Sequence, residues 1–284
     1  MSDNGIIERI DAFCDAVPRQ RARAEEIGPL VLFVPVGPGW PYYARPRLGT
    51  RTPVTVTDVR SVRARQRELV IPESFEWLEQ TAPEMADAAA DAGLDVRRHP
   101  LLALGALSPA PRVPPRVSVR LVTPEDADLV LAWAVPGVAF GYPGMAIGEA
   151  GVTERDKLAA DHDGGTIEML RERLGCGRSV LATAAGPNGP LATGSYQLHG
   201  GVAEITGVGV LPASRRRGLG AAVTHALAAD AVRRGARVVF LSATDATVAR
   251  VYARLGFRQI GTAMIAEPSL CSQYLLSQRQ ILRT

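Results

Sequence analysis

Residues 204–221 read EITGVGVLPASRRRGLGA, and this stretch decides the fold that the sequence predicts. The β-branched residues Ile205, Val208 and Val210 predict a strand that ends before Pro212. A helical pattern opens near Gly218, because apolar residues then recur on one face of a helix. A turn that holds three consecutive arginines and two glycines separates the strand from the helix.

This turn has the composition of an anion site. The first turn of a helix exposes backbone N–H groups that lack partners, and the helix dipole makes that end positive. Arg215, Arg216 and Arg217 would repel that end, and each other, unless an anion lies among them. Gly218 and Gly220 have no Cβ atom, so a ligand can approach the backbone. The stretch therefore predicts a cradle for a diphosphate, and the alternative is a basic, solvated turn.

Two common phosphate-binding loops are excluded by their spacing. The pattern GxxxxGK[ST] is absent from the chain. The dinucleotide fingerprint GxGxxG requires a third glycine where this chain has Val223.

The string V-x-V-x-P-x-x-R-R-R-G-L-G-A, residues 208–221, resembles the acyl-CoA-binding motif of the GCN5-related N-acetyltransferases (GNAT), R/Q-x-x-G-x-G/A after a strand. Arg215, Gly218 and Gly220 match its three fixed positions. The resemblance implies an α/β fold with helices on both faces of a mixed sheet that splays around acyl-CoA. It implies that backbone amides of residues 216–221 hold the diphosphate and that the strand pairs with the pantetheine arm. The residues implied to bind acyl-CoA are Val208, Gly209, Val210, Arg215, Arg216, Arg217, Gly218, Leu219, Gly220, Ala221, Asp245 and Tyr252.

Asp245 and Tyr252 come from a second motif, DATVARVYARLGF at residues 245–257. This motif resembles the family's N-x-x-A-x-x-L-Y-x-x-x-G-F. Tyr252, Gly256 and Phe257 match, whereas Asp245 replaces the asparagine and Val248 replaces the alanine. Tyr252 is the candidate general acid, because a phenol held beside the sulfur can protonate a departing thiolate. The alternative is that Tyr252 only packs on a helix face.

A base is needed because a primary amine must lose a proton when it attacks. Glu204 is the candidate, acting directly or through water, and an apolar cleft would raise its pKa. The alternatives are an exposed glutamate at a strand start, or His199 as the base, while His225 is expected to be structural. The resemblance implies that the backbone N–H of Val210 or Val208 stabilises the oxyanion.

Gly207 and Gly209 fit a bulged strand at this place. The sequence has no metal-ligand set, no GxSxG nucleophile elbow and no cysteine beside a histidine motif. It therefore predicts direct transfer in a ternary complex, with acetyl-CoA or another acyl-CoA as co-substrate and no metal.

The composition limits the class of protein. With 284 residues, of which 46% are hydrophobic and 21% charged, the chain suits one large globular domain or two of ordinary size. The formal net charge of +3 is too small to indicate nucleic acid. Cys14, Cys176 and Cys271 lie far apart, which favours a reducing cytoplasm. A polar N-terminus and the lack of a run of ~20 apolar residues predict neither a signal peptide nor a membrane partner.

Residues 108–116, SPAPRVPPR, hold four prolines and predict a linker. We therefore expect an N-terminal α/β domain over residues 1–108, a linker over 109–115 and a catalytic GNAT domain over 116–284. The order helix, glycine, strand occurs in residues 87–104 and again in 249–265. This echo suggests that the N-terminal domain is a degenerate GNAT-like copy without the cofactor motif.

Local patterns predict helices over residues 3–17, from Pro72 and from Pro83, and a strand over 54–59. Thr123 is expected to cap a helix, and residues 179–185 and 191–198 to form a hairpin. The tail from residue 270 on is expected to form a short helix or an edge strand.

The expected function is N-acetyl transfer from acetyl-CoA to a primary amine of a small molecule or peptide, by a monomer or homodimer. One alternative is a non-catalytic acyl-CoA-binding or regulatory protein of the same fold. A second is an acyltransferase that uses longer acyl-CoA. The sequence does not identify the acceptor.

Overall fold

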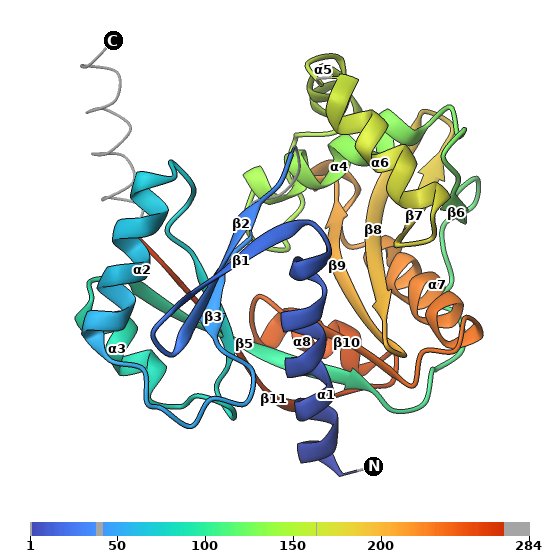
Figure 1. Ribbon diagram of the computed structural model, residues 1–284. Coiled ribbons are helices and arrows are strands. Elements are labelled where there is room, and N and C mark those ends of the chain that lie inside the picture. Colours follow the sequence, from blue (N-terminus) through green and yellow to red (C-terminus); the bar gives the residue numbers. More distant parts are fainter. Residues whose placement is uncertain (1, 38–41, 163, 270–284) are drawn as a thin grey trace. The chain divides into compact units, whose positions relative to one another are not determined.

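A computed structural model describes residues 2–37, 42–162 and 164–269, so the expectation for the tail lies outside the described residues. The chain divides into two compact units, one formed by Met1–Leu101 with Ile260–Thr284 and the other by Leu102–Gln259 (Figure 1). The expected boundary was at residues 108–116, whereas the chain divides at 101–102 and the residues from Ile260 on join the first unit. The assignment of an N-terminal copy and a catalytic domain stays a prediction. No helix in the described ranges is long and apolar enough to cross a membrane.

The first unit is a sheet with helices around it. Its strands lie in the order β1-β2-β3-β4-β11, antiparallel except for the parallel pair β3 and β4. Their bounds are β1 Ala22–Ile27, β2 Leu30–Pro35, β3 Ala44–Pro46, β4 Phe75–Leu78 and β11 Phe257–Glu267. The helices are α1 Asp3–Ala16, α2 Val56–Glu68 and α3 Met85–Asp91, with a 3-10 turn, η1 Pro18–Gln20; strand β5, Asp95–Leu104, leads into the second unit. Leu30, Leu32, Phe75, Trp77 and Met264 are among the residues of its core.

Two local predictions in this unit are wrong. The strand expected at residues 54–59 is the start of α2, because Thr55 and Asp58 form a capping box. The Asp58 N–H donates to Thr55 Oγ1 at 3.3 Å, and the Thr55 N–H donates to Asp58 Oδ2 at 2.9 Å. The helix expected from Pro72 is instead strand β4, in which Phe75 and Trp77 alternate into the core and Trp77 pairs with Met264 of β11.

The second unit has the strand order β6-β7-β8-β9-β10. The first four are antiparallel, whereas β10 runs parallel to β9. The strands are β6 Ser118–Val122, β7 Ser179–Gly186, β8 Gly189–His199, β9 Val202–Val210 and β10 Val238–Ser242, so the expected hairpin is confirmed. The helices are α4 Leu129–Gly141, α5 Val152–Ala160, α6 Gly164–Gly175, α7 Leu219–Arg233 and α8 Ala246–Ala253, with a 3-10 turn, η2 Pro212–Ser214. The cap expected at Thr123 is wrong, since α4 begins only after Asp128 and Thr123 lies in a turn.

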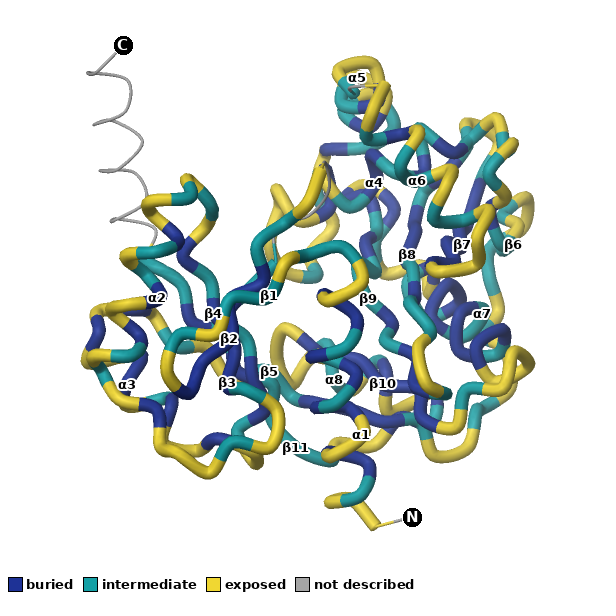
Figure 2. The backbone as a smooth tube through the Cα atoms, in the orientation of Figure 1, coloured by how far each residue is buried: buried dark blue, intermediate teal, exposed yellow. Residues whose placement is uncertain are grey.

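Helices α4 and α7 cover opposite faces of this sheet. A Cβ atom on Gly194 would lie 3.2 Å from Val223 of α7, and one on Gly209 would lie 3.0 Å from the Cβ of Ala139 of α4. Gly209 pairs with Thr193, the neighbour of Gly194, and adjacent residues of a strand face opposite ways. Helices α7 and α6 lie against β7, and Figure 2 shows that β7 is buried along almost its whole length.

Gly256, in the turn after α8, has a φ of 96°, and a Cβ there would overlap the carbonyl oxygen of Ala106. We expect Gly256→Ala to lower the free energy of unfolding by more than about 3 kcal/mol, because strain and overlap add. Gly235 is a matched control, since its φ is 89° but nothing lies within 4 Å of an added Cβ. Gly235→Ala should cost only about 1–2 kcal/mol. Equal losses in urea denaturation would show that the overlap with Ala106 is relieved.

Candidate active site

The centre of the site is the point where β9 and β10 part. They pair only from Val202 to Glu204 of β9, although β9 continues to Val210. On its other edge β9 stays paired with β8, with an irregularity where Thr193 pairs with Gly209 but Ser195 with Thr206. The bulge expected near Gly207 is confirmed. The edge of β9 that faces β10 therefore forms no ladder with β10 beyond Glu204 in the described chain.

The turn that follows β9 collects further backbone donors. Gly218, the N-cap of α7, is left-handed with a φ of 77° and provides no side-chain cap. Within the described ranges, the amides of residues 216–221 donate to no protein acceptor. Gly220 packs against β9, where a Cβ would lie 3.2 Å from Cγ2 of Val210. Backbone donors at a helix start, with no Cβ above them, can bind a phosphate.

The three arginines of this turn have different surroundings. Arg216 and Arg217 are exposed and form no ion pair with a described residue. The Arg215 guanidinium donates to three carbonyl oxygens, those of Ala139 at 2.9 Å, Tyr142 at 2.6 Å and Ala146 at 3.1 Å. Two arginines are thus available to an anion, whereas the side chain of the third is engaged within the protein.

Tyr252 lies on α8 and is 9% exposed, within the core of the second unit. Its ring meets that of Phe257 edge to face, with 6.3 Å between the centroids. Burial raises the pKa of Tyr252 to about 12, and its hydroxyl forms no hydrogen bond with a described residue. Asp245 caps the same helix, since Oδ1 accepts from the N–H groups of Thr247 at 2.7 Å and Val248 at 2.9 Å.

Glu204 is half-buried and directly opposite Gln197 of β8, so the two side chains share one face of the sheet. Arg173 of α6 donates to Gln197 Oε1 at 2.9 Å and to Ser179 Oγ at 3.1 Å, which places α6 on that face. His199 ends β8 on the surface. His225 Nε2 lies 3.0 Å from the carbonyl oxygen of Ser108, in agreement with the structural role expected for it.

A row of polar side chains on this face was not among the residues expected from the sequence. Ser195 Oγ and Thr206 Oγ1 lie 3.3 Å apart, one step along the ladder from Gln197 and Glu204. The signal was present in β8, where polar residues stand at every second position from Thr193 to His199. These hydroxyl and amide groups could orient a polar acceptor beside Glu204.

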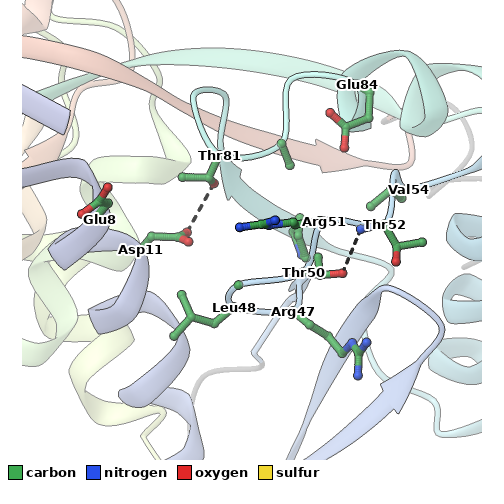
Figure 3. A pocket seen from close by; sticks show the side chains of 13 residues that line it. Glu8, Asp11, Arg47, Leu48, Thr50, Arg51, Thr52, Val54, Thr81 and Glu84 are labelled. Carbon is green, nitrogen blue, oxygen red and sulfur yellow. Dashed lines mark hydrogen bonds between the residues drawn. The ribbon is translucent and has the colours of Figure 1, made fainter. Parts of the chain in front are cut away.

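A separate hollow of about 500 Å³ lies in the first unit, between α1, residues 46–54 and residues 81–84 (Figure 3). Figure 3 shows Arg51 pointing toward Asp11 and Thr81, and Thr81 Oγ1 lies 3.5 Å from Asp11 Oδ1. Asp11 also pairs with the buried Arg45. None of the predicted site residues lines this hollow. In the part of the chain that the structure describes, no cluster of His, Cys, Asp and Glu could hold a metal ion.

The raised pKa of Tyr252 makes stability depend on pH. An unfolded tyrosine ionises near its ordinary value of about 10, and the folded one only near 12. Its contribution is therefore complete below pH 10 and is lost as the pH rises to 12, by about 2–3 kcal/mol. We expect the wild type to lose that much more unfolding free energy than Tyr252→Phe between pH 9 and pH 12, measured with denaturant. Parallel curves would contradict the burial of the phenol.

Known proteins resemble this chain in sequence and in fold. Residues 186–265 match the model of the family described as FR47-like protein. A GCN5-related N-acetyltransferase from Kribbella flavida is 24% identical, over 93% of this chain and 95% of that one, with a TM-score of 0.68. A functionally unknown conserved protein from Staphylococcus epidermidis is 12% identical, over 87% and 94%, with a TM-score of 0.51. No curated protein matches the sequence. The chain therefore has the fold of the GCN5-related N-acetyltransferases, the family that its motifs resemble, and the match to the FR47-like model lies within this fold.

Proposed function

We propose that this protein is an N-acyltransferase that moves an acetyl group from acetyl-CoA to a primary amine within a ternary complex. One observation carries the proposal. The edge of β9 that does not pair with β10 leads directly into six backbone amides that have no protein acceptor in the described chain. Strand edges and helix starts of this kind bind extended ligands that end in phosphates. The acceptor would be a small-molecule or peptide amine, and a reducing cytoplasm suits the separated cysteines.

The residues present fit the two ends of acyl-CoA. The amides of residues 216–221, with the exposed Arg216 and Arg217, would hold the diphosphate. Val208 and Val210 lie on the part of β9 that does not pair with β10, where their backbone groups can meet the amide groups of the pantetheine arm. Asp245 fixes the start of the helix that carries Tyr252, so its part in binding would be to position that helix.

The thioester supplies an activated acyl group, and the chain supplies the proton transfers. Glu204 accepts a proton from the amine, directly or through a water, as the C–N bond forms. Tyr252 gives its proton to the departing sulfur as the C–S bond breaks, and its raised pKa keeps that proton in place until then. A backbone N–H of Val210 or Val208 donates to the carbonyl oxygen of the acyl group.

The main alternative is a non-catalytic acyl-CoA-binding protein, and Asp245 favours it because the family's asparagine is absent. Release of free thiol from acetyl-CoA with a panel of amines separates the two functions. Binding without release in every case would support the alternative. Thiol release only from acyl-CoA with longer acyl groups would show that the protein transfers those groups and not acetyl.

Charge reversal tests the cradle. We expect Arg216→Glu to weaken coenzyme A binding at least about 100-fold in calorimetry, because an attraction to the diphosphate becomes a repulsion. The φ of Arg216 is 64°, and both residues are L-amino acids with a Cβ, so the backbone strain is unchanged. Arg178→Glu is the control, since this exposed arginine precedes β7 at the opposite end of the strands. Equal affinities for both variants would remove the cradle assignment.

Removal of one oxygen tests the general acid. Tyr252→Phe should lower kcat by about 10²–10⁴ and leave the affinity for coenzyme A within a few-fold, because the proton donor is lost and the ring stays. The measurement is a steady-state thiol-release assay with an amine that the wild type acetylates. A loss of affinity at constant kcat would instead identify Tyr252 as a packing residue.

A further inference from the structure

Arg215 binds the end of a helix that lies far from it in the sequence. Its guanidinium donates to the carbonyl oxygens of Ala139, Tyr142 and Ala146. Ala139 is in the last turn of α4 and Tyr142 is its C-cap. Carbonyls at this end have no partner within the helix, and a cation is favourable at the negative end of its dipole.

The backbone ties the same two parts of the chain together. The Gly148 N–H donates to the carbonyl oxygen of Pro212 at 3.2 Å, and the Ala213 N–H donates to that of Ala150 at 2.9 Å. Three side-chain and two backbone hydrogen bonds thus join residues 139–150 to residues 212–215. We call residues 139–150 the α4–α5 segment.

Burial does little to hold the α4–α5 segment. None of residues 140–149 is buried, and Phe140, Tyr142 and Ile147 are exposed by 60%, 50% and 67%. A segment with few buried contacts opens easily unless its hydrogen bonds hold it. The bonds to residues 212–215 therefore set its position.

The α4–α5 segment begins beside the proposed acyl site. Helix α4 packs on β9 at Gly209, against Ala139, and Gly209 lies two residues beyond the bulge at Gly207. On its other side, Arg215 is directly followed by the amides of residues 216–221. One arginine therefore joins the diphosphate cradle to a segment that borders the acyl site.

We propose that Arg215 is a positioning residue that couples occupation of the cradle to the position of the α4–α5 segment, an inference that rests on the proposed function. An anion that fixes residues 216–221 also restricts the backbone of Arg215, and the guanidinium passes this restriction to the three carbonyls. By linkage, the segment favours anion binding by the same factor.

Hydrogen exchange of residues 139–150, with and without coenzyme A, measures this coupling without an acceptor. In the wild type and in the control Arg178→Met, coenzyme A should slow exchange of the segment about fivefold, a modest coupling. In Arg215→Met the segment should exchange faster, and coenzyme A should no longer slow it. Calorimetry should show coenzyme A binding weakened by no more than the same fivefold.

Two results would overturn the coupling. One is a response of the α4–α5 segment to coenzyme A that persists in Arg215→Met. The other is a loss of affinity as large as that of Arg216→Glu, which would make Arg215 a ligand of the anion itself. A wild type that does not bind coenzyme A would instead remove the proposed function. Should Arg215→Met not fold, Arg215→Lys serves, since a single ammonium nitrogen replaces the two guanidinium nitrogens that divide the three carbonyls between them. A full response in that variant would equally overturn the proposal.

Discussion

The site depends on a strand that pairs on both edges where it begins and on one edge where it ends. β10 accompanies β9 only to Glu204, while β8 follows it to Val210. Backbone groups that lose a ladder partner need water or a ligand in its place. The packing of α4 at Gly209 and of α7 at Gly194, on opposite faces, keeps the strands in place beside the parting. The fold itself therefore keeps this edge of β9 unpaired with β10 beyond Glu204. The backbone N–H donors of the following turn continue the row of available groups.

Local signals predicted the elements whose causes are local. The strand and helix around residues 204–221, helix α1 and the β7–β8 hairpin follow from periodicity and turn residues near at hand. Strand β4 could not be predicted in this way, because the helix signal of Pro72 competes with pairing to β11, whose residues lie between 185 and 191 positions later in the sequence. At Thr55 two local signals disagreed: β-branched neighbours favoured a strand, but the reciprocal bonds with Asp58 favoured a helix start.

The candidate site could be predicted from the sequence where it is one continuous motif. It could not be predicted where residues from distant parts of the chain form it. The turn at residues 215–221 and the Tyr252 motif are continuous strings of sequence, so their resemblance to the family's motifs was enough to find them. The alternation in β8 indicated that its polar side chains share one face, but it could not show that Arg173 of α6 and Thr206 of β9 meet them there. The partners of Arg215 lie between 69 and 76 residues earlier, so spacing could not tell it from Arg216.

The arginine run shows why position at a helix end matters more than the number of charges. Arg215 lies at the C-terminal end of α4, where its charge complements the dipole and its donors satisfy carbonyls. Arg216 and Arg217 precede the N-terminal end of α7, where the dipole has their own sign. No described carboxylate pairs with either of them. An anion there would offset both the dipole and the mutual repulsion, because the turn is hydrogen-bonded on the side of Arg215 and positively charged on the side of Arg216 and Arg217.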